Sequence, residues 1–198
     1  MIKQISKVTL TLTLFAVISI IFVSTTQTIT KDKIKINIKQ TLIKSLSELI
    51  TNDKYDNDIL NDKITIALTL HNIEQTITIY LAKKKDTVIA YLIKHTYPNG
   101  YNGNIDLLTG IDANNNLLGI RVIAHKETPG LGDKIEIKKS NWITKFKGLS
   151  LTNTKIWKVK KDGGEFDQFT GATITPRAIV SGAYELLLKF NKIKSNIK

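Results

Sequence analysis

The chain has 198 residues, of which 42% are hydrophobic and 23% are charged, an ordinary globular mixture that excludes a wholly disordered protein. It has no cysteine, which excludes disulfides, cysteine-ligated iron–sulfur clusters, thiolate zinc sites and cysteine nucleophiles. The net charge of +12 comes from lysines scattered along the chain, since only Arg121 and Arg177 among the 29 basic residues are arginines. Base readout favours arginine, so we expect no nucleic-acid partner.

The N-terminal segment has the composition of a membrane anchor. Lys3 and Lys7 precede residues 8–30, which carry no charge. As a helix this stretch is about 34 Å long, enough to cross a hydrocarbon core of about 30 Å. The end of the apolar run, Val23 to Gln27, lacks the small residues of a signal-peptide cleavage site. We therefore expect a retained anchor, and the two lysines place its N-terminus in the cytoplasm and the rest of the chain outside.

The remaining elements follow from periodicity and turn residues. Apolar residues at spacings of three and four predict an amphipathic helix over 30–50, followed by a polar loop over 51–62. β-branched alternation predicts five strands, with a turn at 98–100: 63–70, 74–82, 87–95, 104–112 and 117–125. A helix at 141–146, a short strand at 156–159, a loop at 160–165 and a final helix at 176–191 complete the chain.

These elements predict an α+β protein in three segments. Residues 1–30 form the cytoplasmic N-terminus and transmembrane anchor, 31–62 an amphipathic helix and connector, and 63–198 one domain with an antiparallel sheet and flanking helices.

The start of the final helix is a candidate anion site. Thr175 followed by Pro176 is typical of an N-cap and a first helical position. The unpaired N–H groups of a helix N-terminus favour an anion, and Thr173 and Arg177 lie on either side of it. From these residues alone, an ordinary capped helix after a small-residue turn is the commoner explanation.

Three segments carry a resemblance to a known family. The segment Asp167-Gln168-Phe169-Thr170-Gly171-Ala172-Thr173 resembles the flavinylation motif of bacterial FMN-binding domains. Residues 100–112 and 125–132, the latter reading His-Lys-Glu-Thr-Pro-Gly-Leu-Gly, resemble two further signatures of the same domain. With the anchor and the first helix in the expected order, the chain resembles, over nearly its full length, the G-type subunits of the Rnf (Rsx) ion-translocating electron transport complexes.

The resemblance implies a covalent flavin. In that family the last threonine of the motif carries FMN through a phosphoester bond, installed by a flavin transferase that uses FAD, and the matching residue is Thr173. The other residues expected at the cofactor are Thr170, Gly171, Ala172, Thr175, Arg177, Glu127, Thr128, Gly130, Leu131 and Gly132. We expect no metal site and no catalytic residue. Gly130, Gly132 and the excess of lysine over acidic residues favour the anionic form of the reduced flavin.

The resemblance also implies a place and partners. The protein is expected in the bacterial inner membrane with its domain in the periplasm, relaying electrons between other subunits and matured by the flavin transferase. Two alternatives stay open: the C-type subunit of the Na⁺-translocating NADH:quinone reductase, which tends to be longer, and a membrane-tethered binding or sensor module without a redox cofactor. The roles of Glu127 and His125 stay open too. Tyr101, Trp142 and Phe169 are candidates to pack on the flavin ring, with core packing as the default for each.

Overall fold

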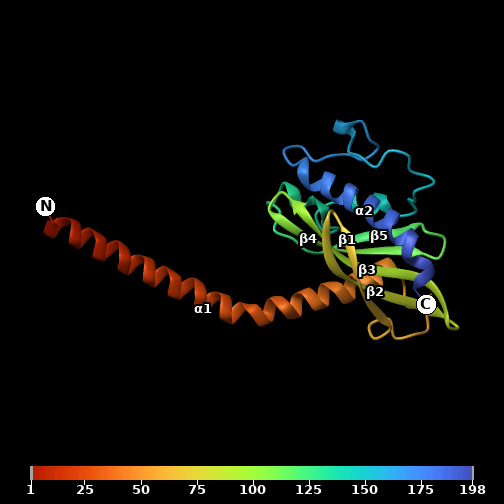
Figure 1. Cartoon of the computed structure of the whole chain (residues 1–198), viewed down its shortest axis with the longest axis horizontal. Helices are drawn as coiled ribbons and strands as arrows, with labels where there is room; N and C mark the ends of the chain where they lie inside the picture. Colours follow the sequence, from red (N-terminus) through yellow and green to blue (C-terminus); the bar gives the residue numbers. More distant parts are fainter. Residues whose placement is uncertain (1, 198) are drawn as a thin grey trace. The chain divides into compact units, whose positions relative to one another are not determined.

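The computed structural model describes residues 2–197 and begins with one long helix, α1 (Ile2–Leu49) (Figure 1). The two helical segments predicted before residue 50 are therefore continuous. Within α1, threonine hydroxyls donate to carbonyls one turn earlier, as Thr25 does to Ile21 at 2.8 Å, so they need no water. Length and apolar composition suit α1 to a membrane span. The chain divides into two compact units, residues 1–41 and 42–198.

The second unit is built on the predicted sheet. Five strands follow one another in sequence order, each antiparallel to the next: β1 (Lys63–Leu70), β2 (Ile73–Lys84), β3 (Thr87–Gly100), β4 (Gly103–Asp112) and β5 (Leu117–Ala124). His71 and Asn72 have φ of 56° and 60°, the positive values that a two-residue hairpin requires. The turn predicted at 98–100 is wrong, because β3 continues to Gly100 and the chain reverses at Tyr101 and Asn102.

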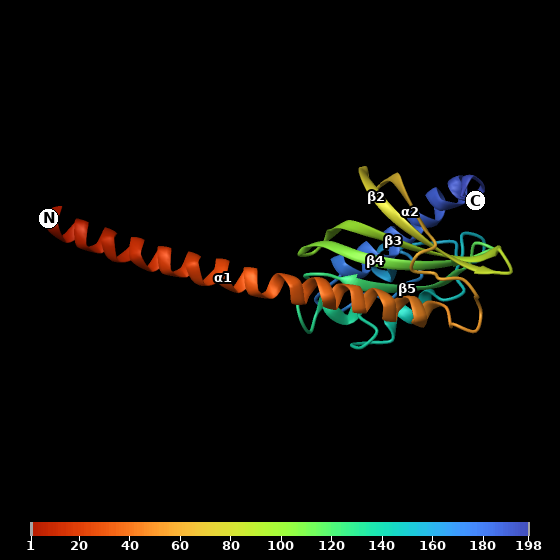
Figure 2. The ribbon, with the colours of Figure 1, turned by 90° about the horizontal axis from the view of Figure 1, so that it is seen from below.

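Helix α2 (Ile174–Ile193) packs on one face of this sheet (Figures 1 and 2). The ring of Phe190 lies 5.1 Å from that of Tyr91 in an edge-on contact. Gly182 allows a close approach, since a Cβ there would lie 3.0 Å from the Tyr97 ring. The predicted antiparallel sheet with flanking helices is confirmed, and α2 is longer than predicted at both ends.

The last turns of α1 cover the opposite face of the sheet. Leu46 and Leu49 are buried there, and Leu49 lies over Gly110 and Gly119, which face each other across β4 and β5. A Cβ on Gly119 would come within 3.1 Å of the Leu49 side chain, so this glycine pair makes the room that the helix needs. Glu48 accepts a hydrogen bond from Arg121 Nε at 2.7 Å beside this contact.

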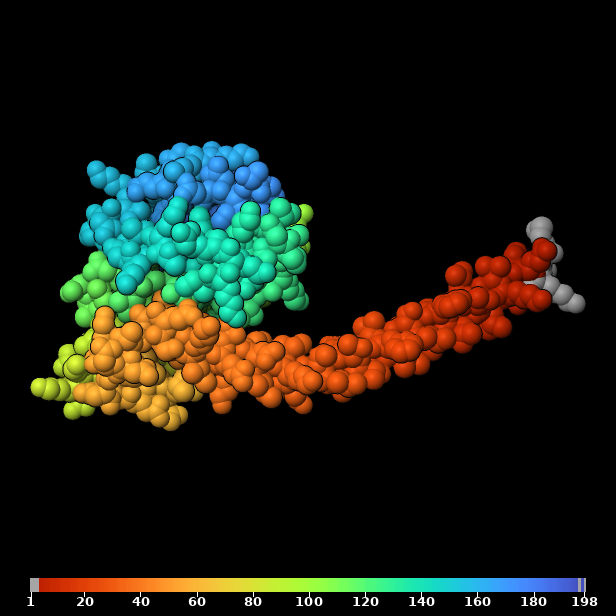
Figure 3. Space-filling model, turned by 180° about the vertical axis from the view of Figure 1, so that it is seen from behind, coloured from red at the N-terminus to blue at the C-terminus, as the bar shows by residue number. Residues whose placement is uncertain are grey.

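The chain between β5 and α2 is mostly irregular, and Figure 3 shows it beside α2 and extending toward the residues that follow α1. The helix predicted at 141–146 is a 3₁₀ helix, η2 (Trp142–Phe146), and the strand predicted at 156–159 is reduced to one bridge between Val159 and Phe166. Short 3₁₀ helices η1 (Gly132–Ile135), η3 (Lys160–Asp162) and η4 (Lys194–Asn196) complete the secondary structure of residues 2–197. Aromatic packing holds this segment, with Phe146 and Phe166 stacked 5.0 Å apart.

Candidate functional site

Helix α2 begins two residues earlier than its sequence suggests. Its first residue is Ile174 and Thr173 flanks it, so Pro176 is the third helical residue and not the first. The N-cap predicted at Thr175 is wrong: its side chain is buried and its hydroxyl donates to Glu127 Oε2 instead. The local pattern predicts that this hydroxyl caps the helix, but it bonds instead to a carboxylate 48 positions away in sequence.

A tight turn precedes the helix. Ala172 N–H donates to Phe169 C=O at 3.1 Å, and Gly171 between them has a φ of +79°. The third position of a type II turn requires such a positive φ, which residues other than glycine rarely adopt. The turn brings Thr173 to the edge of a cavity.

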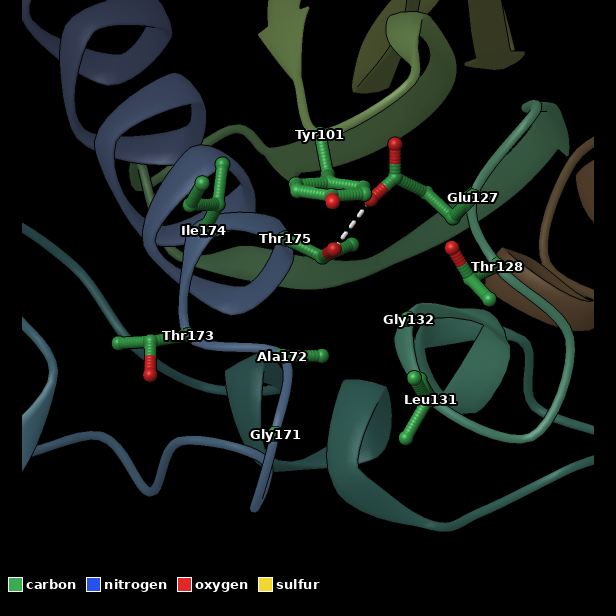
Figure 4. Close-up of a pocket in the computed structure, with 10 residues that line it drawn as sticks. All are labelled: Tyr101, Glu127, Thr128, Leu131, Gly132, Gly171, Ala172, Thr173, Ile174 and Thr175. Atoms are coloured by element: carbon green, nitrogen blue, oxygen red, sulfur yellow. Dashed lines mark hydrogen bonds between the residues drawn. The ribbon is translucent and has the colours of Figure 1, made fainter.

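This cavity has a volume of about 260 Å³. Two walls form it, the loop after β5 and the start of α2, with Tyr101 from the β3–β4 turn (Figure 4). Three of its apolar residues are unusually exposed for their size: Tyr101 at 63%, Leu131 at 42% and Ile174 at 43%. Figure 4 shows Tyr101 and Leu131 on opposite sides of the cavity, which suits a flat apolar ring between them. The lining residues are Tyr101, Glu127, Thr128, Leu131, Gly132, Gly171, Ala172, Thr173, Ile174 and Thr175.

Glu127 is the buried carboxylate of this cavity, with only 4% of its surface exposed. Its Oε1 accepts the backbone N–H of Asn102 at 3.0 Å, and its Oε2 accepts the hydroxyl of Thr175. Through these bonds the carboxylate joins the β3–β4 turn to α2, and the next helix, η1, receives no side-chain cap. Gly132 leaves the space for this arrangement, since a Cβ there would lie 2.8 Å from Thr175 Oγ1 and 3.1 Å from Glu127 Oε2.

The cavity lining holds no lysine or arginine among the described residues. Arg177 lies outside it and donates from Nε and Nη2 to the two carboxylate oxygens of Asp162, at 2.6 and 2.8 Å. This fork raises the pKa of Arg177 and lowers the pKa of Asp162. The lining therefore gives no support to the expected cationic surroundings of the flavin. Its one carboxylate, that of Glu127, would disfavour an anionic flavin.

The first residue of the motif is fixed by charge. Asp167 accepts from Lys145 Nζ at 2.5 Å and from Lys160 Nζ at 2.6 Å, and these hydrogen bonds lower its pKa to about 2. Its carbonyl also accepts the indole N–H of Trp142 at 2.8 Å. Trp142 and Phe169 pack together in the core, with their rings 5.1 Å apart. For both residues, core packing is therefore the observed role, and neither lines the cavity.

The threonines of the site differ in what their hydroxyls do. Thr175 is buried and bonded to Glu127, Thr128 accepts from Asn102 Nδ2 at 3.3 Å, and Thr170 is exposed outside the lining. Thr173 lines the cavity, is partly exposed, and within residues 2–197 has no hydrogen-bond partner for its hydroxyl. This hydroxyl therefore lies at the cavity edge without a partner in the described part of the chain.

Most of the predicted site is thus brought together. Thr170, Gly130 and Arg177 lie outside the lining, although Gly130, with a φ of +77°, shapes the turn that presents Leu131. Sequence reasoning missed Ile174, and Tyr101 lines the cavity where core packing was the default. Ile174 directly follows the flavinylation motif and Tyr101 lies inside the signature at 100–112, and these places in the sequence are the signal that marks them.

Comparison with known proteins agrees with this geometry. Residues 100–187 match the FMN-binding domain, and residues 1–49 match the RnfG N-terminal region. The chain is 42% identical over 182 residues to the G-type subunit of the ion-translocating oxidoreductase complex of Vibrio vulnificus, covering 91% of this chain and 86% of that protein. It is 43% identical over 190 residues to the corresponding protein of Shewanella baltica, covering 94% and 89%.

The chain belongs to the RnfG family, the G-type subunits of ion-translocating oxidoreductase complexes. The matched N-terminal region favours this family over the alternative from the NADH:quinone reductase, and the matched FMN-binding domain favours a flavin carrier over a module without a cofactor. Together they support an electron-carrier role in an ion-translocating oxidoreductase complex. An RnfG protein with one N-terminal apolar helix fits a single-pass inner-membrane protein.

Proposed function

We propose that this RnfG protein relays electrons within its complex through FMN joined to Thr173 Oγ by a phosphoester bond. The observation that carries the proposal is the contrast among the threonines: Thr173 alone among those of the motif and helix start combines a place in the lining, partial exposure and a hydroxyl without a partner in the described chain. An ester bond also suits a carrier on the outer face of the membrane, where a flavin that dissociated would be lost by dilution.

The attachment step balances with FAD as the co-reactant. The Thr173 oxygen forms a bond to the phosphorus on the FMN side of FAD, the bond from that phosphorus to the bridging pyrophosphate oxygen breaks, and AMP leaves. The hydroxyl proton is released, and a flavin transferase supplies the catalytic groups. The start of α2 then lies beside the phosphate, where the unpaired N–H groups of a helix N-terminus favour negative charge.

The remaining residues fit a flavin. When bound, FMN supplies the reversible electron transfer, and the protein supplies orientation and electrostatics. Tyr101, Leu131 and Ile174 offer exposed apolar surface for the ring, and Gly171 lets the backbone approach it closely. Glu127 holds the two walls of the cavity together.

The topology follows from the anchor. We place the N-terminus, with Lys3 and Lys7, in the cytoplasm and the FMN-binding domain, residues 63–198, in the periplasm. In that position the flavin exchanges electrons with neighbouring proteins of the complex.

A gel experiment tests the covalent flavin. The full chain is produced together with a flavin transferase, denatured, separated by electrophoresis and examined for flavin fluorescence. The wild type should fluoresce and Thr173→Val should not. Valine has nearly the shape of threonine, and the position is partly exposed, so stability should change by no more than about 0.5 kcal/mol. Thr170→Val is the matched control and should remain fluorescent.

Each result has a clear meaning. A dark wild-type band, or a fluorescent Thr173→Val band, would refute the attachment at Thr173. If the wild-type band is not fluorescent and the folded protein also binds no flavin without a covalent bond, the result would favour the sensor module without a redox cofactor.

A further inference from the structure

The loop that follows β5 supplies one wall of the cavity but has little structure of its own. Glu127, Thr128 and Leu131 all come from it, before η1 begins at Gly132. The backbone N–H groups of residues 131, 132 and 133 converge on the carbonyl of Thr128, at 3.2, 3.0 and 3.4 Å. These bonds order the second half of the loop and leave open what fixes Glu127 in its first half.

His125 contacts the backbone of Glu127 in this first half. Its Nδ1 accepts the backbone N–H of Glu127 at 3.0 Å, and its Nε2 lies 3.1 Å from Glu136 Oε1. Because Nδ1 accepts, it carries no proton, so a neutral ring carries its proton on Nε2 and donates it to Glu136. One tautomer therefore satisfies both contacts, and the ring joins the start of the loop to Glu136, the residue after η1.

The Glu127 carboxylate bonds to two elements outside its own loop. Its two oxygens reach partners on two other elements, Asn102 N–H in the β3–β4 turn and the Thr175 hydroxyl in α2. Both bonds require the backbone of residue 127 to lie where His125 holds it. Gly100 and Gly132 leave little spare space, since a Cβ on either would come within 3.1 Å of a carboxylate oxygen of Glu127.

We propose that His125 is a positioning residue of the flavin site, acting through the Glu127 amide to hold the cavity wall against the cofactor. The aspect that concerns the flavin rests on the proposed function above. The aspect that concerns the loop does not, because both contacts join residues of this chain.

Two conservative variants separate the two ring nitrogens. In His125→Asn, the amide oxygen takes the place of Nδ1 and can still accept from Glu127, whereas the contact with Glu136 is lost. In His125→Gln, the terminal amide takes the place of Nε2 and can still donate to Glu136, but the Glu127 N–H loses its acceptor. Glu136→Gln keeps an acceptor for Nε2 and serves as a control that removes only charge.

The first measurement is amide hydrogen exchange at residue 127 in the full chain without flavin, in detergent. His125→Gln should exchange faster than wild type by about tenfold or more, and His125→Asn and Glu136→Gln should stay close to wild type. The second is the visible spectrum and fluorescence yield of the flavin-labelled protein, which His125→Gln should shift and His125→Asn should retain.

The outcomes separate this inference from the proposed function. If the wild type takes up no flavin, the proposed function fails, and the exchange rates still decide the role of His125. If the wild type is labelled but His125→Gln matches His125→Asn in both exchange and spectrum, the inference is overturned. Unchanged far-ultraviolet circular dichroism in all three variants excludes unfolding as the cause.

Discussion

His95 makes the stability of the domain depend on pH. It lies on the α2 side of β3 with 2% of its surface exposed, and its Nε2 is 2.9 Å from Thr109 Oγ1. Its Nδ1 has no hydrogen-bond partner within the described chain. Burial, with a smaller contribution from the nearby His71, lowers the pKa of His95 to about 3. The folded protein therefore keeps this imidazole neutral in mild acid.

The loss of stability follows from proton linkage. In the unfolded chain a histidine titrates near pH 6.5, so between pH 7 and pH 4.5 the unfolded state gains a proton that the folded state does not. The neutral imidazole leaves the fold at full stability above about pH 6.5, and stability falls as the pH drops below it. Integrated over this interval, the free energy of unfolding decreases by about 2.5 kcal/mol on account of His95.

Urea unfolding of the full chain in detergent, followed by tryptophan fluorescence at both pH values, measures this loss. Other groups titrate in the same range, so the comparison is with His95→Gln, whose amide can still bond to Thr109 but does not titrate. The wild type should lose about 2.5 kcal/mol more than the variant between pH 7 and pH 4.5. Equal losses in the two proteins would refute the assignment of a neutral, buried His95.

Three further predictions concern other regions of the molecule. Gly119→Ala should lower the free energy of unfolding by about 1–3 kcal/mol, because the residue has a φ of +144° and its new Cβ meets the buried end of α1; an unchanged urea midpoint would contradict this. Lys145→Gln or Lys160→Gln alone should slow flavin attachment little, because Asp167 keeps one ion-pair partner. The double variant should slow attachment clearly in a time course of gel fluorescence. A double variant labelled at the wild-type rate would show that these ion pairs do not affect attachment. In the cysteine-free chain, Lys161→Cys should react with a membrane-impermeant maleimide in cells whose outer membrane alone is permeabilised, and Lys7→Cys should react only after lysis; the reverse pattern would invert the proposed topology.

The elements of the fold that the sequence predicts well are those fixed by neighbours along the chain. Alternating residues such as those of 63–70 give a strand wherever one face is covered, and the positive-φ pairs at 71–72 and 85–86 lie in the gaps between the predicted strands. The small-residue turn expected before the final helix is present too, at residues 169–172. These features need no knowledge of distant partners.

The errors arise where a distant residue competes with a local pattern. Thr175 followed by Pro176 is a sound helix-start signal, but Glu127 accepts the hydroxyl and the helix starts earlier. Arg177 was expected near the phosphate because it follows the helix start, whereas Asp162 forms a fork with it. Exposure of Tyr101 depends on how a turn meets two other segments, which no local pattern predicts.

The glycine pair beneath Leu49 bears on how a soluble fragment should be cut. Leu46, Leu49 and Ile50 are buried with the sheet and not with the anchor, and the compact unit begins at residue 42. A fragment that starts at residue 63 would leave this glycine-lined hollow open to water and lack the Glu48 partner of Arg121. A truncated protein for crystallisation or spectroscopy should therefore keep the chain from residue 42 onward.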